Sequence, residues 1–303
     1  MLAPQSKVKK AVIPAAGFGT RMFPVTKVIK KELLPIIDRD GRAKPIILKI
    51  VEEALNAGIE EVGIVVQKAD LEIFQEFFLA APKAELLAKL SPENREYSQY
   101  LQDLGQRITF LIQDRQEGFG HAVFCAQTWV NNEPFLLLLG DHIYLSQEGL
   151  SCAGQLLAAF EQAECSVVGL TVMPGEIIHK AGCVAGVWQK PNSLLQVTKL
   201  YEKPDLEYAK ANLHVTGLPE SDFLGVFGMY VLTPEIFDYL EAEIENNLRY
   251  RGEFQLTTCL DRLREEKGIV GYLVKGKYFD VGMPQFYWQT VRDFYQLCDI
   301  LPR

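Results

Sequence analysis

Cysteine is scarce in this chain of 303 residues, and none of its six cysteines forms a C-x-x-C pair. The two that lie nearest in sequence, Cys152 and Cys165, are 13 residues apart. This spacing argues against a zinc cluster and against a disulfide scaffold. We therefore expect small core cysteines and a cytoplasmic protein, because a reducing compartment keeps thiols free.

Long apolar runs are absent as well. The most apolar stretch, Phe135–Leu139, has the length of a β-strand and falls far short of the roughly 20 residues that a transmembrane helix needs. The lysines near the start, Lys7, Lys9 and Lys10, are not followed by an apolar region. We expect neither a secretory leader nor a membrane partner.

Positive charge is scarce outside the first fifty residues. That segment holds 11 Lys and Arg against 3 Asp and Glu, whereas the other 253 residues hold 20 against 36. A basic segment on an acidic chain predicts that the segment meets an anion, although a solvated basic face would produce the same pattern. The chain lacks the broad basic surface with interleaved aromatic residues that is typical of nucleic-acid binding, so we expect a small polyanion and no nucleic acid.

The first half of the chain alternates short β-branched runs with amphipathic stretches. We expect strands over Val8–Ile13, Glu61–Val66, Ile108–Ile112 and Phe135–Leu139, and helices from Pro45 to Gly58 and after an Asp70 N-cap. This order predicts an α/β protein with a largely parallel sheet covered by helices on both faces. Residues 83–104 are more polar and predict a helical insertion on the surface.

The second half has shorter connections and predicts a more mixed sheet. Strands are expected over Ser166–Met173, Cys183–Gln189, Leu195–Glu202 and Leu224–Leu232, and helices over Pro234–Glu245, Phe254–Glu266 and about 284–300. There is no internal repeat and no flexible linker. We therefore expect residues 1–303 to form a single domain with two functional halves, about 7–145 and about 146–282.

A loop of small residues, Pro14–Arg21, follows the first expected strand. Small residues let backbone N–H groups approach the phosphates and the base edge of a nucleotide. The Walker A motif is excluded because no Gly-Lys-Ser/Thr follows, and a dinucleotide fingerprint fails because Met22 stands where its last glycine belongs. A tight turn with incidental glycines would explain the loop if it stood alone.

The chain from Ala15 to Pro35 resembles the signature of the sugar-1-phosphate nucleotidyltransferases, and among them the bacterial UTP–glucose-1-phosphate uridylyltransferases. That signature closes a small-residue loop with Gly-x-Gly-Thr-Arg-Met, here Gly17–Met22, and has Lys-Glu-hydrophobic-Leu-Pro downstream, here Lys31–Pro35. Further matches are Gln113, Gly118–Val123, Gly140-Asp141-His142, Lys180–Val184, Glu202-Lys203-Pro204, Gly252–Thr257 and Phe279-Asp280-Val281-Gly282.

Three departures place the chain on a side branch of this family. Gly140-Asp141-His142 stands where the family usually has Pro-Asp-Val, and Ala181-Gly182 stands where it has Tyr-Gly. An extra turn, Asp38–Arg42, precedes Lys44-Pro45.

The resemblance implies a Rossmann-like fold of the GT-A type, with a mostly parallel mixed sheet and helices on both faces. It implies a nucleotide-binding half over about 7–145 and a sugar-binding half over about 146–282. The implied reaction transfers a uridylyl group from UTP to glucose 1-phosphate by Mg²⁺-assisted in-line attack, giving UDP-glucose and pyrophosphate. A homo-oligomer, either a dimer or a tetramer, is expected.

The resemblance also implies roles for individual residues. The catalytic cations are Arg21, Lys31 and Lys203, and the metal ligands are Asp141 and Asp280. The nucleotide-binding residues are Ala15, Ala16, Gly17, Gly19, Thr20, Arg21, Gln113, Gly118 and Asp141, and the sugar-binding residues are Gly182, Glu202 and Lys203. Lys27 and Lys30 either contact phosphate or only add to the positive field.

Other functions remain open. Thymidylyl or cytidylyl transfer to a related sugar 1-phosphate, with galactose 1-phosphate as one candidate, would use the same motifs. A non-catalytic paralogue that senses a nucleotide sugar would be expected to lose Arg21, Lys31 or an aspartate, and all of them are present. A dinucleotide-dependent oxidoreductase is disfavoured by Met22.

Overall fold

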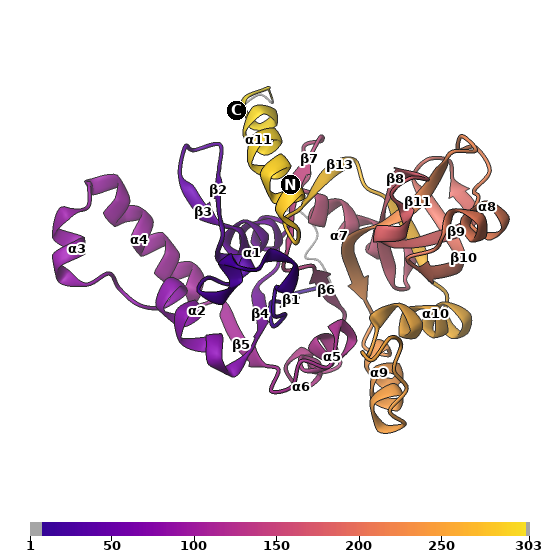
Figure 1. The fold of residues 1–303 in the computed structure, drawn as a ribbon, viewed down its shortest axis with the longest axis horizontal. Coiled ribbons are helices and arrows are strands. Elements are labelled where there is room, and N and C mark those ends of the chain that lie inside the picture. Colours follow the sequence, from indigo (N-terminus) through magenta and orange to yellow (C-terminus); the bar gives the residue numbers. More distant parts are fainter. Residues whose placement is uncertain (1–7, 301–303) are drawn as a thin grey trace.

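The computed structural model describes residues 8–300, and its central feature is a nine-stranded sheet in the order β5-β4-β1-β6-β11-β8-β12-β10-β9 (Figure 1). The first four strands in this order pair in parallel: β5 (Ile108–Ile112), β4 (Glu61–Val66), β1 (Lys10–Pro14) and β6 (Phe135–Leu138). All four were expected from the sequence, with bounds that differ by two residues at most. The protein is an α/β protein.

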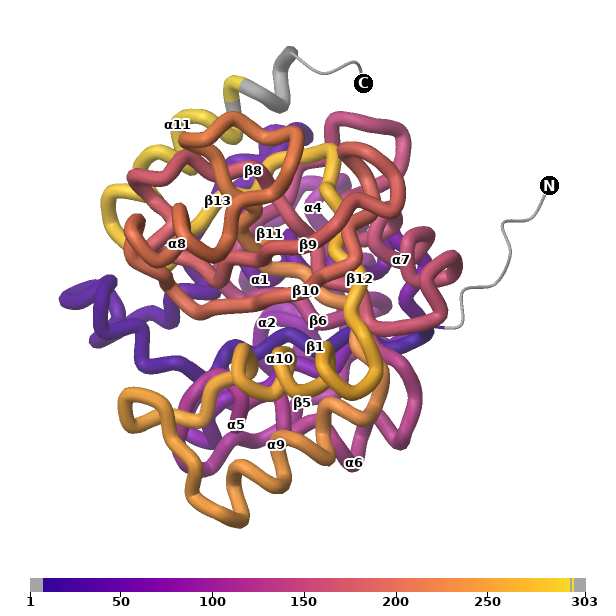
Figure 2. Tube along the Cα trace, turned by 90° about the vertical axis from the view of Figure 1, so that its right-hand side faces the viewer, coloured from indigo at the N-terminus to yellow at the C-terminus, as the bar shows by residue number. Residues whose placement is uncertain are grey.

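The other five strands form a barrel. They are β8 (Val167–Pro174), β9 (Gly182–Lys190), β10 (Leu194–Glu202), β11 (Asp222–Leu232) and β12 (Val270–Leu273). The barrel closes because β11 pairs with both β8 and β9, while β12 and β10 complete the ring. In Figure 1 these strands gather at the right, and in Figure 2 they face the viewer.

The expectation that the sheet as a whole is mostly parallel is therefore wrong, whereas the more mixed pairing expected for the second half is confirmed. In the barrel only β12 and β8 pair in parallel, and β11 joins β6 antiparallel. The physical reason is connection length. A parallel pair needs a crossover of a dozen or more residues, whereas residues 191–193 alone join β9 to β10.

Helices cover both faces of the parallel strands, as expected. On one face lie α1 (Ile46–Asn56), α2 (Leu71–Phe78) and α7 (Cys152–Ala163), and on the other α5 (Phe119–Phe124), α6 (Gln127–Val130), α9 (Ile236–Glu245) and α10 (Leu256–Lys267). The helices on each face pack on a separate hydrophobic core. Successive side chains of a strand point to opposite faces, so Ala11 and Ile13 belong to the core on one face of β1 and Val12 belongs to the core on the other.

One expected helix cap is wrong. Asp70 precedes α2, but its side chain makes no capping hydrogen bond. Its carboxylate lies 2.8 Å from Nζ of Lys30 instead. Asp70 therefore ties α2 to the loop that follows β1.

The polar segment 83–104 is helical, as expected, and projects as an arm at the left of Figure 1. It contains α3 (Ala84–Lys89) and α4 (Pro92–Gly105). The extra turn Asp38–Arg42 is the tip of a hairpin of β2 (Pro35–Ile37) and β3 (Ala43–Pro45). Arg42 Nη1 donates to Asn94 Oδ1 at 2.6 Å, so the hairpin tip touches the arm.

A buried ion cluster holds the hairpin on α1. Lys44 Nζ lies 2.7 Å from Asp38 Oδ2 and 3.2 Å from Glu52 Oε1, and Lys49 Nζ lies 2.8 Å from the same Asp38 oxygen. Burial opposes ionisation of Asp38, but the charges and hydrogen bonds of both lysines hold its pKa at about 2. The cluster therefore stays charged at neutral pH.

Several elements were not expected from the sequence. Strands β7 (His142–Ser146) and β13 (Gly276–Asp280) form a separate antiparallel pair that aligns Asp280 with His142. The short α8 (Leu206–Asn212), which lies outside the barrel, was not expected either. The last helix, α11 (Pro284–Ile300), agrees with the helix expected over about 284–300. The β7–β13 pair brings the C-terminal part of the chain to the end of β6.

Three of the described cysteines lie in the core, as expected from the sequence, and two are only half-buried. Cys152, Cys183 and Cys259 are buried, and these three as well as Cys125 and Cys165 are free thiols. The side chain of Cys298 lies outside the described residues. Over residues 8–300, no helix has both the length and the apolar character needed to span a membrane.

Candidate active site

A cavity of about 860 Å³ opens between the parallel strands and the barrel. It lies at the carboxyl ends of β1, β5 and β6, where ligands bind in open α/β sheets. All of the candidate residues line it except Ala15. Ala15 is buried beneath the loop, and its N–H donates to Val65 O at 2.7 Å.

The small-residue loop is held in place from both sides. Gly19 has φ +66°, and a Cβ there would lie 2.8 Å from Thr26 Cγ2, so this position requires glycine. Gln67 Nε2 donates to Ala16 O at 2.7 Å, and Lys30 Nζ donates to Gly17 O at 3.0 Å. The backbone N–H groups of the loop are therefore presented on a fixed frame.

These contacts bear on whether Lys27 and Lys30 can touch a phosphate or only add to the positive field. Lys30 is bound to Gly17 O and to Asp70, and it does not line the cavity. Lys27 does not line the cavity either. Neither lysine is positioned to touch a ligand there.

Lys31 and Asp141 form the shortest ion pair between described residues that line the cavity. Lys31 Nζ lies 2.7 Å from Asp141 Oδ2 and 3.5 Å from Glu32 Oε1. Burial would lower the pKa of Lys31, but the two carboxylates outweigh it and raise that pKa above its usual range. Burial would raise the pKa of Asp141, and the Lys31 charge holds it well below its usual range. Both groups are therefore ionised at neutral pH.

Asp280, which is close to the C-terminal end of the chain, lies near Asp141 in the cavity. Gly282 N donates to Asp280 Oδ1 at 2.6 Å, and Val281 N donates to Asp141 O at 2.9 Å. A Cβ on Gly282 would lie 2.7 Å from Asp141 Oδ2, 3.1 Å from Asp280 Oδ1 and 3.2 Å from Arg21 Nη2. Two carboxylates and one guanidinium thus converge on a notch that the missing side chain of Gly282 leaves open.

The two carboxylates of this notch could hold a hard divalent cation whose other ligands would come from a substrate and water. Among the described residues, no three His, Cys, Asp or Glu side chains gather into a ready metal cage. Mg²⁺ does not need one, because it is usually bound by one or two carboxylates together with phosphate oxygens and water.

Glu202 and Lys203 line the barrel side of the cavity. Lys203 Nζ lies 3.1 Å from Glu202 Oε1, and Thr257 Oγ1 donates to Glu202 Oε2 at 2.7 Å. Lys203 has φ +50°, a strained conformation for a side chain of this kind, and its N–H donates to Ala181 O at 3.2 Å. A Cβ on Gly182 would lie 3.2 Å from Glu202 Oε2, so glycine keeps this carboxylate accessible.

Gln113 is buried at the end of β5, at the opposite wall of the cavity. Its backbone N–H donates to Val66 O at 2.9 Å. Its side-chain Nε2 lies 3.3 Å from Gly118 O and 2.9 Å from His121 Nδ1. Gly118 has φ +114°, and a Cβ there would lie 2.6 Å from Phe254 O.

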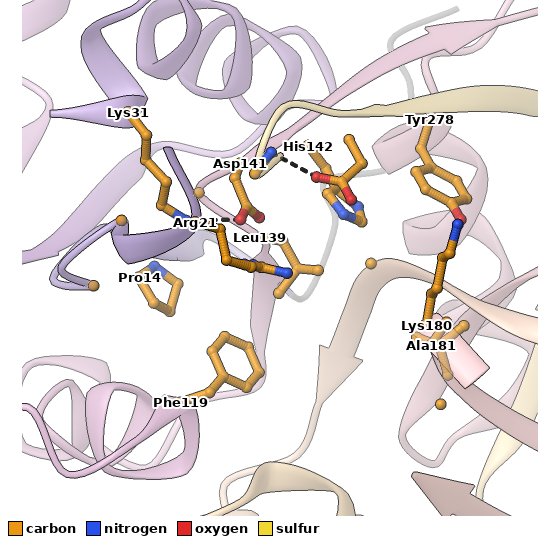
Figure 3. Close-up of a pocket in the computed structure, with 18 of the residues that line it drawn as sticks. Pro14, Arg21, Lys31, Phe119, Leu139, Asp141, His142, Lys180, Ala181 and Tyr278 are labelled. Carbon is orange, nitrogen blue, oxygen red and sulfur yellow. Dashed lines mark hydrogen bonds and ion pairs between the residues drawn. The ribbon is translucent and has the colours of Figure 1, made fainter. Parts of the chain in front are cut away.

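Several residues that line the cavity, Glu32, Lys180 and Thr257 among them, were given no role on the basis of the sequence. Glu32 lies in the matched segment Lys31–Pro35 and Thr257 in the matched segment Gly252–Thr257. These motifs were the sequence signal that could have assigned both residues to the site. Lys180 likewise begins the matched segment Lys180–Val184, and its Nζ lies 4.7 Å from the centre of the Phe286 ring. Figure 3 shows Lys180 across the cavity from Arg21 and Lys31.

The cavity can therefore hold two anions at once. Arg21 and Lys31 supply positive charge beside Asp141, and Lys180 and Lys203 supply it from the barrel side. Between them lies the carboxylate notch at Gly282. This pattern suits two phosphate-bearing ligands that must approach each other against their mutual repulsion.

Comparison with known proteins gives a consistent result. A profile of the family described as "Nucleotidyl transferase" matches residues 10–296. The UTP–glucose-1-phosphate uridylyltransferase of Staphylococcus epidermidis is 38% identical over 278 residues, which cover 91% of this chain and 88% of that protein. The enzyme of the same name from Bacillus subtilis is 37% identical over 291 residues, covering 95% and 91%.

Solved structures agree with the fold. A UDP-glucose pyrophosphorylase complexed with UDP-glucose has a TM-score of 0.77 at 29% identity, covering 96% of this chain and 99% of that one. A UTP-bound enzyme from Acinetobacter baumannii has a TM-score of 0.74 at 27% identity, covering 95% and 93%.

Glu32 generates a prediction about pH and stability. Burial raises the pKa of Glu32 to about 7, although Lys31 opposes the shift. An acid whose pKa is raised on folding stabilises the fold below its ordinary pKa and loses that contribution as the pH rises through the higher value. We expect Glu32→Gln to gain stability relative to the unmodified chain between about pH 5 and pH 8.5, by on the order of 3 kcal/mol.

Urea unfolding at the two pH values, without nucleotide or metal, measures this difference. The matched control is Glu60→Gln, because Glu60 is exposed and, within residues 8–300, its carboxylate pairs only with exposed Lys9. An equal change for both variants would contradict the prediction.

Proposed function

The chain belongs to the nucleotidyl transferase family, and from this premise we propose that it transfers the uridylyl group of UTP to glucose 1-phosphate, giving UDP-glucose and pyrophosphate. The activity is that of a UTP–glucose-1-phosphate uridylyltransferase, as in the relatives that are 37% and 38% identical. The observation that carries the proposal is the single cavity that collects the small-residue loop, Gln113, Asp141 and the Glu202-Lys203 pair.

The proposed reaction does not need a general base. An oxygen of the sugar phosphate attacks the α-phosphorus of UTP, the bond to the bridging oxygen breaks, and pyrophosphate leaves opposite the nucleophile. The nucleophile is already an anion, so no proton has to be removed. The protein must align the two phosphates and neutralise the charge that builds on the leaving group.

Arg21 and Lys31 are proposed to act on the triphosphate. The guanidinium of Arg21 can make a two-pronged contact with phosphate oxygens. Lys31 is ionised, and its contact with Asp141 keeps it in the cavity, which supports a role beside the α-phosphate. The loop residues Ala15, Ala16, Gly17, Gly19 and Thr20 are proposed to hold the nucleotide, with Gln113 and Gly118 at the base.

Lys203 is proposed to hold the phosphate of the sugar and Glu202 to accept its hydroxyl groups. Thr257 supports this assignment, because its hydroxyl occupies Glu202 Oε2 and so fixes the carboxylate. Gly182 leaves room beside that carboxylate for the ring of the sugar.

Asp141 and Asp280 are proposed to hold one Mg²⁺. The ion, when bound, neutralises phosphate charge that the two lysines and the arginine do not reach. Asp280 is oriented for this by the N–H of Gly282, which leaves its second carboxylate oxygen free of that bond.

The remaining expectations belong to the same proposal. We infer a Rossmann-like fold of the GT-A type in which residues 1–303 work as one domain, because the cavity draws on both 7–145 and 146–282. A cytoplasmic site of action is supported by the free thiols of the described cysteines. A homo-oligomer, dimer or tetramer, remains a prediction from the family resemblance.

A substrate matrix tests the proposed function. Pyrophosphate release is measured for UTP, dTTP, CTP, ATP and GTP with glucose 1-phosphate and galactose 1-phosphate. We expect UTP with glucose 1-phosphate to have the highest kcat/KM, dTTP to follow at about 10- to 200-fold less because one methyl group is a weak barrier, and the others to be about 10³-fold or more behind. A leading CTP or ATP would contradict uridylyl transfer, and no release with any pair would favour a sensor.

Lys203 generates a prediction about the sugar phosphate. Because its charge is proposed to touch only that substrate, Lys203→Ala should raise KM for glucose 1-phosphate by about 10- to 100-fold and change KM for UTP by less than about threefold. Lys199→Ala is the matched control, since Lys199 lies on β10, the strand that ends just before Lys203, and bonds to Asn212 away from the cavity. Equal increases in both constants would rule out the assignment.

Asp280 generates a prediction about the metal. Asp280→Asn should lower kcat by about 100-fold or more and raise the Mg²⁺ concentration needed for half activity, because one of two protein carboxylates is lost. The control is Asp222→Asn at the start of β11, outside the cavity. Unchanged turnover with an unchanged Mg²⁺ midpoint would remove Asp280 from the metal site.

A further inference from the structure

We propose that His121 is a positioning residue that sets the base specificity of the reaction by fixing which polar atom of Gln113 faces the nucleotide. The inference rests on the proposed function, because it concerns the base end of the same cavity. It is carried by a chain of contacts that runs from Gln113 through His121 to Arg249.

The first step is the orientation of the Gln113 amide. Gly118 O is a carbonyl oxygen and can only accept, so the amide atom 3.3 Å from it must be the nitrogen. This carbonyl is held in place because it also accepts a hydrogen bond from Ala122 N at 3.1 Å. The second hydrogen of the same nitrogen is then directed at His121 Nδ1, 2.9 Å away.

The second step is the state of the imidazole. Because Gln113 Nε2 donates, His121 Nδ1 must accept, and the ring proton of the neutral form is carried by Nε2. Nε2 faces the carboxylate of Glu117 at 3.7 Å. That carboxylate is itself held by Arg249, whose Nη2 lies 2.6 Å from Glu117 Oε1 and whose guanidinium lies 4.0 Å from the centre of the Phe254 ring.

The third step is what remains for a ligand. Both amide hydrogens of Gln113 are engaged within the protein. Its Oε1 makes no hydrogen bond to any of the residues that the structure describes, and Gln113 lines the cavity. The amide therefore meets a nucleotide base as an acceptor.

An acceptor at this place discriminates between pyrimidines. Uracil and thymine present N3–H, which donates to it, whereas cytosine presents a lone pair at N3. A glutamine that was free to rotate would offer its NH₂ group to cytosine and lose this selectivity. His121 prevents that exchange, because a rotated amide would place its oxygen against the lone pair of Nδ1 and against Gly118 O. A buried polar group left unpaired is costly, so the wrong base is rejected.

The test is the ratio of kcat/KM for UTP to that for CTP. His121→Phe keeps an aromatic ring beside Phe254, where the ring centres are 6.4 Å apart, and removes the acceptor. We expect the UTP/CTP ratio to fall at least about tenfold in this variant. His121→Asn should restore it to within about threefold of the unmodified ratio, because the asparagine Oδ1 can accept where Nδ1 did.

His214→Phe is the matched control, since His214 is exposed and does not line the cavity, and its ratio should not change. Where the phenylalanine variant does not fold, His121→Leu provides the same loss of the acceptor in a smaller side chain. Equal losses for UTP and CTP, with the ratio unchanged in both variants, would overturn the role of His121 and leave the proposed function standing. A preference of the unmodified protein for CTP would instead overturn the proposed function.

Discussion

The contact between Lys31 and Asp141 is the interaction on which the candidate site depends. It joins the segment after β1 to the end of β6, with Nζ and Oδ2 2.7 Å apart in a largely buried position. Taking two charges out of water is costly, and such a pair often stabilises a fold no better than apolar side chains would. The pair keeps both groups ionised, however, and holds them at the mouth of a cavity that also contains Arg21 and Asp280. A phosphate-bearing ligand therefore meets charges that are already in place.

The barrel supplies the other half of the cavity through its closure. Because β11 pairs with β6 as well as with two barrel strands, the end of β10 is brought opposite the small-residue loop. The segment before α10 then returns to the first half, where Phe254 N donates to Glu117 O at 2.8 Å and Gly120 N donates to Phe254 O at 2.9 Å. The segment that leads into α10 thus contacts both walls of the cavity, because Thr257 Oγ1 also donates to Glu202 Oε2.

Much of the first half could be predicted from local patterns, since buried parallel strands are continuous apolar runs and α1 repeats its apolar residues on one face. The short strands β7 and β13 could not, because each is stable only beside the other and they lie 130 residues apart in the chain. Asp70 shows the same limit. Its position before α2 is that of a cap, but the nearby ammonium of Lys30 competes more strongly for the carboxylate than the helix N–H groups do.

The sequence by itself determined the α/β class and the strands and helices of the first half. It also determined which residues form the small-residue loop and the motifs that follow it along the chain, because periodicity and motif spacing are local properties. Only the tertiary structure decided that the second half closes into a barrel, that Asp280 joins Asp141 at Gly282, and that Lys30 supports the loop instead of the ligand. It also decided that His121 holds the Gln113 amide. These outcomes depend on strand register and on contacts between distant segments, where charge, burial and steric fit select among arrangements that the local sequence permits equally.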